Sequence, residues 1–368
     1  MEQARDRKIP AGETADAALR AAAYTRAGRA YSLMGKGRKR TMIARRTLLI
    51  APVLAGFLAL GGHAAAQSFP TGPITFVVSF PPGGSIDVVM RAMAPKLQER
   101  LGKPVVIENR AGAGGNIAAA VVAKAAPDGH MLLAPASSLA ANPALVKNMP
   151  FDTLKDLQAV SLLFRTPLAL VVNPGVPAKS VSELIALAKQ KPSEISFGHS
   201  GAGAAIFLAA ELFQTMTGTK MNGVAYRGAP PALNDVMAGH VSVMFADAGS
   251  VVGHINSGKV RALGVSSTTR VQALPNVPTI AEAGVPGFDA VGWTLICAPS
   301  GTPKSVIDRL NRDITEVAQS PEMRALMVKL GTIPVAENAP PPELQKFLAS
   351  EIDRWGRLIE KAGLARSQ

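Results

Sequence analysis

ITFVVSF at 74–80, followed directly by PPGGSID at 81–87, is the segment most informative about the fold. An apolar, β-branched run that breaks at two glycines and leads into a helical pattern predicts a strand, a turn and a helix. The same design recurs in PVVIENRAGAGGNIAA at 104–119 and in EISFGHSGAGAAIFLAAELF at 194–213. Backbone N–H groups at a helix start lack partners within the helix, and the helix dipole adds positive charge there. We therefore expect each turn to hold an anion, in a cleft between two lobes.

The pattern beyond these turns predicts the fold class. From Pro73 on, β-branched runs, among them LALVVNP, VSVMFAD and VRALGVSS, alternate with longer Ala/Leu-rich stretches, which is typical of an α/β protein with mostly parallel sheets. The C-terminal stretch reads as helix alone, and we expect it to pack on the first lobe. We expect the chain to cross between lobes near 168–174 and 290–303. The lobes are then 68–168 plus 292–368, and 169–291, with the ligand site between them.

The composition indicates a globular protein with a positive N-terminal segment. The chain has 368 residues, 18% of them charged, and a net charge of +13. Residues 1–66 contain twelve Lys or Arg and four Asp or Glu, so they carry most of that excess. The remainder is only mildly basic, and we expect no nucleic acid partner.

The N-terminal segment resembles an export signal. The basic run GKGRKRTMIARR precedes the apolar stretch LLIAPVLAGFLAL and the small residues Ala64 and Ala66. About 13 apolar residues are too few to span a bilayer, so we expect cleavage near Ala66 and a periplasmic location. Ordinary secretion and a twin-arginine route through Arg45 and Arg46 both remain open. Residues 1–66 thus read as an export signal preceded by an extension: the first 33 residues fit neither signal nor domain, and translation starting at Met34 or Met42 is an alternative.

Cysteine and histidine usage predicts neither disulfides nor a metal site. Cys297 is the single cysteine, so no intramolecular disulfide can form. The five histidines are widely scattered and show no metal-ligand spacing. We expect no metal and no cofactor.

Two glycine turns have rival interpretations. The turn Gly112–Gly115 lacks the third glycine of a dinucleotide-binding fingerprint, because position 117 is Ile, and no acidic residue ends a strand about 20 residues on. GHSGAG resembles a nucleophile elbow, which would make Ser200 the nucleophile of an exported serine esterase. The only downstream histidines are His240 and His254, which read as surface or capping residues. We expect a protein that is not an enzyme, with the esterase as the alternative.

Polar residues at the ends of strand-like runs are further candidates, because open α/β sheets bind ligands there. They are Ser137, Ser138, Tyr226, Arg227 and Asp247. Arg227 could clamp a carboxylate, or it could cap a helix.

Taken together, several segments closely resemble the substrate-binding receptors of tripartite tricarboxylate transporters, the Bug receptors. The resemblance runs from about Phe69 to the C-terminus. It rests on FPPGGSID, VVIENRAGAGGNIAA, PDGHMLL, FGHSGAGAAIFLAAELF, VAYRGAPPALNDVMAGHVSVMFAD, LPNVPTIAEAGVPGFDAVGW and APSGTP in this order.

The resemblance implies a type II periplasmic binding protein, a two-lobed "Venus flytrap" with a central sheet flanked by helices in each lobe. Such a receptor is expected to act as a monomer that closes on a small mono-, di- or tricarboxylate, possibly aromatic. It would deliver this ligand to membrane permease subunits, or to a sensor instead. The implied ligand-binding residues are Phe80, Pro82, Gly83, Gly84, Ser85, Asp87, Gly112, Ala113, Gly114, Gly115, Ser137, Ser138, Ser200, Gly201, Ala202, Gly203 and Asp247.

Overall fold

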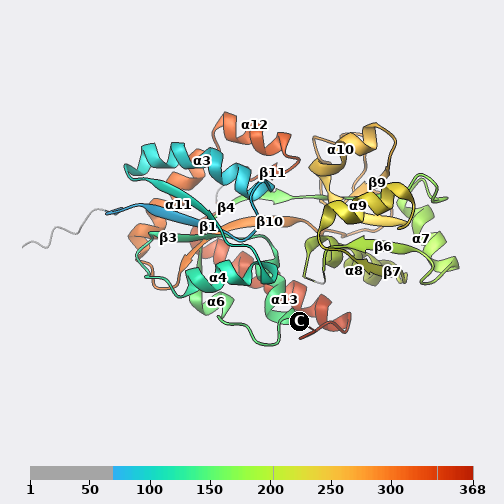
Figure 1. Cartoon of the computed structure of the whole chain (residues 1–368), viewed down its shortest axis with the longest axis horizontal. Helices are drawn as coiled ribbons and strands as arrows, with labels where there is room; N and C mark the ends of the chain where they lie inside the picture. Colours follow the sequence, from blue (N-terminus) through green and yellow to red (C-terminus); the bar gives the residue numbers. More distant parts are fainter. Residues whose placement is uncertain (1–68, 202, 338, 368) are drawn as a thin grey trace, which may run out of the picture. The chain divides into compact units, whose positions relative to one another are not determined.

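The computed structural model describes residues 69–201, 203–337 and 339–367, and its strands form two sheets (Figure 1). The six-stranded first sheet has the order β11-β4-β10-β3-β1-β2. Its strands are β1 (Ile74–Val78), β2 (Val105–Asn109), β3 (Met131–Ala134), β4 (Leu157–Thr166), β10 (Gly292–Pro299) and β11 (Ile333–Pro334). The five-stranded second sheet has the order β7-β6-β8-β5-β9. Its strands are β5 (Leu168–Val172), β6 (Ser196–His199), β7 (Asn222–Ala225), β8 (Val243–Asp247) and β9 (Arg261–Val265).

Both sheets are mixed, so the expectation of mostly parallel sheets was wrong. β1 pairs in parallel with β2 and β3, and β6 pairs in parallel with β7 and β8. The strand that enters each sheet from the other sheet is antiparallel to its neighbours: β10 is antiparallel to β3 and β4, and β5 is antiparallel to β8 and β9. A strand that enters a sheet from the other sheet, rather than through a βαβ crossover, is free to run antiparallel.

Two groups of helices accompany the first sheet. One group contains α3 (Ser85–Leu101), α11 (Lys304–Ala318) and α12 (Pro321–Lys329), which contact one another. Phe76 and Val78 share one buried cluster with these helices, whereas Val77, between them on β1, belongs to a second cluster. The other group contains the 3₁₀ turn η1 (Ala113–Gly115), α4 (Asn116–Ala123), α5 (Ser138–Leu145), α6 (Thr153–Asp156) and α13 (Pro341–Lys361).

The C-terminal helices contact the first sheet or its helices, as the sequence predicts: α11 and α13 contact β4, and α12 contacts α3. The second sheet is accompanied by α7 (Val181–Gln190), α8 (Ala205–Thr217), α9 (Ala229–Ala238) and α10 (Ala248–Asn256). None of the helices in the described part of the chain is long and apolar enough to span a bilayer.

The chain passes twice between the two sheets. β4 ends at Thr166 and β5 begins at Leu168, so the first passage is made at Pro167. The return runs from β9 into β10, which begins at Gly292. These points lie close to the lobe boundaries expected from the sequence, and we retain those boundaries as a proposal.

Glycines allow one close contact between elements of the two sheets. Gly249, in the first turn of α10, lies against Leu330 and Gly331 at the end of α12. A Cβ on Gly249 would overlap the Leu330 carbonyl group, and a Cβ on Gly331 would overlap the Gly249 backbone. This approach therefore requires glycine at both positions.

Candidate functional site

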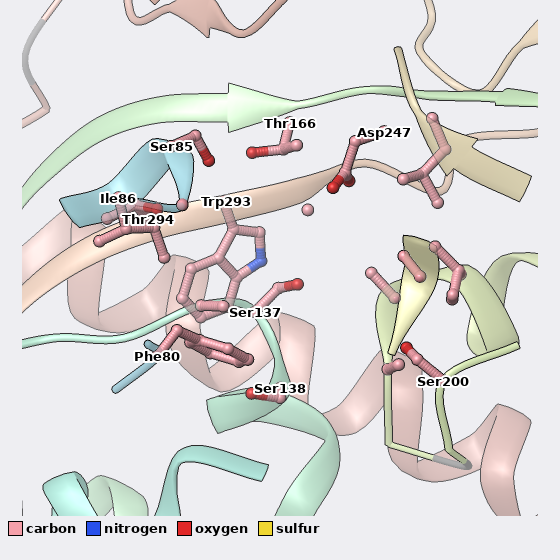
Figure 2. Close-up of a pocket in the computed structure, with 18 of the residues that line it drawn as sticks. Phe80, Ser85, Ile86, Ser137, Ser138, Thr166, Ser200, Asp247, Trp293 and Thr294 are labelled. Atoms are coloured by element: carbon pink, nitrogen blue, oxygen red, sulfur yellow. The ribbon is translucent and has the colours of Figure 1, made fainter. Parts of the chain in front are cut away.

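A cavity of about 270 Å³ lies where residues of both sheets and their helices meet (Figure 2). We call the residues from the first sheet and its helices the first wall: Phe80, Pro81, Gly84, Ser85, Ile86, Asp87, Ala136, Ser137, Ser138, Thr166, Gly292, Trp293 and Thr294. The second wall is formed by residues of the second sheet and its helices: Leu168, Ser200, Ala204, Ala205, Ile206, Ala229 and Asp247. The volume is slightly below the usual range for small-molecule sites, about 300–1,000 Å³. The cavity therefore suits a small ligand.

Five described helices begin at this cavity. The first turn of α3 and the start of α5 belong to the first wall, whereas α8, α9 and α10 begin at the second wall. None of the five has a hydrogen bond from a capping side chain to its first amides. Some of their first amides already donate to main-chain carbonyls, namely those of Leu139, Ala140 and Ala248, and α9 has proline at 230 and 231. The remaining N–H groups, mainly in α3 and α8, and the helix dipoles add positive potential at the cavity. This arrangement can bind an anion without a cationic side chain.

The lining side chains are apolar or neutral hydroxyls, apart from two carboxyls. Phe80, Ile86, Leu168, Ile206 and Trp293 provide the large apolar surface. Hydroxyls come from Ser85, Ser137, Ser138, Thr166, Ser200 and Thr294. The lining formed by described residues includes no lysine, arginine or histidine. Main-chain amides and hydroxyls are therefore the groups available there to an anionic ligand.

Asp87 is one of the two carboxyls, and its hydrogen bonds stabilise the first glycine turn. It is 4% exposed, and it accepts hydrogen bonds from the Gly83 N–H, Arg91 Nε and Asn109 Nδ2, each at 2.9 Å. Burial acts to raise the pKa of this carboxyl, but these donors and the Arg91 charge outweigh burial and lower the pKa. Asp87 is thus a satisfied, ionised group. The Gly83 amide is already used by Asp87, and neither Gly83 nor Pro82 is part of the lining.

The second glycine turn lies behind the first wall rather than in it. Gly112, Ala113, Gly114 and Gly115 are absent from the lining. The Gly114 carbonyl accepts hydrogen bonds from Ser138 Oγ at 2.8 Å and Asn142 Nδ2 at 3.1 Å. A Cβ on Gly115, which has φ +96°, would lie 3.2 Å from Ser79 Cβ. The turn therefore positions the start of α5, and with it Ser138.

The third glycine turn contributes Ser200 to the second wall. Gly201 and Gly203 are outside the lining, and Ala202 lies outside the described residues. The Gly201 N–H donates to His199 Nδ1 at 3.2 Å. His199 is buried and has aromatic contacts with Phe197 and Phe207, and burial lowers the pKa of its imidazole.

The surroundings of Ser200 do not resemble a hydrolase triad. Among the described residues, no histidine or other side chain forms a hydrogen bond with the Ser200 hydroxyl. His240 contacts Asp235 instead, with 3.4 Å between His240 Nδ1 and Asp235 Oδ1. The described residues also contain no cluster of three potential metal ligands.

Asp247 is the other carboxyl of the cavity. It ends β8 and precedes α10, but its side chain does not cap that helix. Within the described chain this carboxylate has no hydrogen-bond or ion-pair partner. It is exposed to the cavity, yet protein atoms surround it, and this desolvation raises the pKa of the carboxyl. The group therefore lacks a counterion.

Tyr226 and Arg227 also follow a strand but do not line the cavity. The Tyr226 hydroxyl donates instead to Asp235 Oδ2 at 2.6 Å.

Trp293 is the most important lining residue that the sequence did not indicate. It lies on β10, beside the passage between the sheets, and its Nε1 donates to Glu351 Oε2 of α13 at 2.9 Å. Trp355 Nε1 donates to the same oxygen at 3.1 Å. The residue is 3% exposed, so packing and the hydrogen bond to Glu351 fix the position of the indole. Its place in an expected crossing run, AVGWTLICAPSGTP, was the one available signal, because such runs pass the cleft.

Comparison with known proteins decides the family. The model of the tripartite tricarboxylate transporter family receptor matches residues 89–364. This chain belongs to that family. Protein BugT of Bordetella pertussis is 41% identical to it over 322 residues, covering 86% of this chain and 98% of BugT.

Solved structures of similar proteins agree with this family assignment. An R. palustris protein with adipate has 34% identity and a TM-score of 0.71, covering 81% of this chain and 99% of that protein. MatC of Rhodopseudomonas palustris with bound malate has 32% identity and a TM-score of 0.69, covering 79% and 100%. The periplasmic binding protein BugD gives 32% identity and a TM-score of 0.70, covering 81% and 99%. The chain is thus a solute-binding receptor with the two-lobed fold of this family, as the sequence predicted.

Proposed function

We propose that this receptor is exported to the periplasm, binds a small carboxylate in the cavity between its two walls and delivers it to the permease subunits of a tripartite transporter. The observation that carries the proposal is the meeting of five uncapped helix starts at a cavity whose described lining lacks cationic side chains. Hydrogen bonds to a charged group are worth about 1.5–3 kcal/mol each. Four or five of them are enough for micromolar affinity, about 8 kcal/mol, before ordering costs.

Binding from both walls explains how the ligand would favour closure. The lobes that we propose, residues 68–168 plus 292–368 and residues 169–291, are joined by the passages at Pro167 and before Gly292. A ligand that contacts both walls has more favourable contacts when the walls are close, so it shifts the population toward that arrangement. The related proteins solved with adipate and with malate support a carboxylate as ligand.

Isothermal titration calorimetry on the mature chain, beginning near Gln67, tests the proposal. Mono-, di- and tricarboxylates are titrated beside the uncharged amide of each acid. We expect at least one acid to bind with micromolar affinity and its amide to bind at least tenfold more weakly. Failure of every carboxylate to bind, to a protein that native mass spectrometry shows to be free of retained ligand, would overturn the proposal.

Delivery to a permease and the expected monomeric state need separate measurements. Size-exclusion chromatography with light scattering reports the mass of the receptor. Detergent-solubilised permease subunits encoded beside the receptor gene, immobilised on a sensor surface, should bind the receptor more tightly when the ligand is present.

A further inference from the structure

The two ends of the cavity differ in charge, because only the second wall has an unpaired carboxyl, that of Asp247. The other lining carboxyl, Asp87, already has three donors, whereas Asp247 has none among the described residues. A ligand carboxylate placed beside Asp247 would meet a like charge or would have to drive protonation of Asp247, and no described lysine or arginine of the lining would offset that cost. The favourable end for a carboxylate is therefore the first wall, near the starts of α3 and α5.

The first wall also provides hydroxyls at that end. Ser85 begins α3, and Ser137 and Ser138 lie at the start of α5. In Figure 2, Ser85 and Ser138 lie on the first-wall side of the cavity, and Asp247 and Ser200 lie on the other side. A ligand that spans the cavity therefore meets helix amides at both ends, with several hydroxyls at the first wall and with one hydroxyl and the unpaired carboxyl at the second.

The middle of the cavity is apolar. Phe80 and Trp293 line the first wall (Figure 2), and Ile206 and Leu168 line the second wall. Rings and short alkyl chains pack well on such surfaces, and a charged group there would lose hydration without a partner.

We propose that the cavity takes a small monocarboxylate that carries an amine at its opposite end, with the carboxylate on the first wall, the amine bound by Asp247 and the apolar part packed on Phe80 and Trp293. This inference rests on the proposed function and narrows its substrate class. An ammonium group would supply the counterion that the Asp247 carboxyl lacks among the described residues of the lining.

Two ligand series of matched length test the inference by calorimetry. One series is 6-aminohexanoate, hexanoate and adipate, and the other is 4-(aminomethyl)benzoate, 4-methylbenzoate and terephthalate. In at least one series we expect the amino acid to bind at least tenfold more tightly than the diacid, with the simple monoacid between them. The variant Asp247→Asn should remove the advantage of the amine and should strengthen binding of the diacid.

Glu211→Gln is the matched control, because Glu211 is an acid on α8 that does not line the cavity. It should leave the order of the ligands unchanged. Thermal melting of both variants confirms that they are folded.

The outcomes separate this inference from the proposed function. If no monoacid or diacid binds in either series or in the wider carboxylate screen, the proposed function itself fails. If carboxylates bind but the diacid matches or exceeds the amino acid in both series, the inference is overturned while the proposed function stands. An equal effect of Asp247→Asn on all members of a series would also overturn it, because Asp247 would then not act on the far end of the ligand.

Discussion

The two walls of the cavity are built from the same element, a helix that begins without a capping side chain, but differ in what surrounds it. On the first wall, hydroxyls and two aromatic rings lie beside the helix starts. On the second wall, small residues, one hydroxyl and one unpaired carboxyl lie there. Helix starts thus provide positive potential on both sides of the cavity, whereas the neighbouring side chains determine which part of a ligand each side accepts.

The largest expected effect comes from removing one amide on either wall. Ser85→Pro deletes the first N–H of α3, and proline is tolerated there because Gly84 has φ −74° and ψ 166°. We expect calorimetry to show Kd weakened about tenfold to a hundredfold, the loss of one hydrogen bond to a charged group. Ala205→Pro makes the same change on the second wall, after Ala204 with φ −76° and ψ 143°. It should weaken binding less.

Ser85→Ala and Ala205→Gly are the controls, because both keep the N–H group. An unchanged affinity in both proline variants would show that these helix starts do not hold the ligand. A larger loss in Ala205→Pro would place the carboxylate on the second wall instead.

A smaller effect is expected where elements of the two sheets touch. Gly249→Ala puts a Cβ against the Leu330 carbonyl, so the backbone has to shift. Overpacking of this kind costs about 1–3 kcal/mol, which urea unfolding measures, and ligand affinity should fall because the second wall is displaced. Gly253→Ala, on the same helix with open space around it, should be neutral or stabilise by up to about 1 kcal/mol. Equal stability of the two variants would refute the contact between Gly249 and Leu330.

The smallest effect on affinity is expected at Trp293. It tests whether this residue contributes to binding through its ring or through its hydrogen bond to Glu351. Trp293→Phe keeps a ring but removes the donor to Glu351, and we expect urea unfolding to show a loss of about 1.5 kcal/mol. Trp355→Phe removes the other indole donor to the same oxygen, away from the cavity. Both variants should lose similar stability, while only Trp293→Phe changes ligand affinity. If Trp355→Phe changed the ligand affinity as much as Trp293→Phe, the change would come from the lost hydrogen bond to Glu351 and not from the Trp293 ring.

Much of the fold was predictable because its signals are local. The strands β1, β2, β5, β6, β8 and β9 were all expected from β-branched runs that end at turns. Strand β4 was not assigned, since polar residues such as Gln158 and Ser161 interrupt its apolar pattern. Helix α5 was also missed, because Asn142 and Pro143 are poor helix residues. Tertiary contacts stabilise it instead: Asn142 Nδ2 donates to the Gly114 carbonyl and to Asn116 Oδ1.

The candidate site was predictable in part for the same reason. Phe80, Gly84, Ser85, Asp87, Ser137, Ser138, Ser200 and Asp247 were expected and do line the cavity. Sequence gives the position of a glycine turn but not its depth, so the place of Gly112–Gly115 behind Ser138 was not foreseeable. Their assignment as ligand-binding residues, like that of the whole set, stays a prediction. Trp293 was missed because the sequence predicts the crossing near 290–303 but not which of its side chains lines the cavity.

The uncapped helix starts have a consequence for how such a receptor can diversify. A main-chain amide is present whatever residue follows it, and among single replacements only proline removes it. Mutations in the lining can therefore alter which ligand shapes and polarities are accepted, while the main-chain amides that bind the negative charge stay in place. Duplicated copies of one gene could explore new cargoes in this way without first losing the ability to bind.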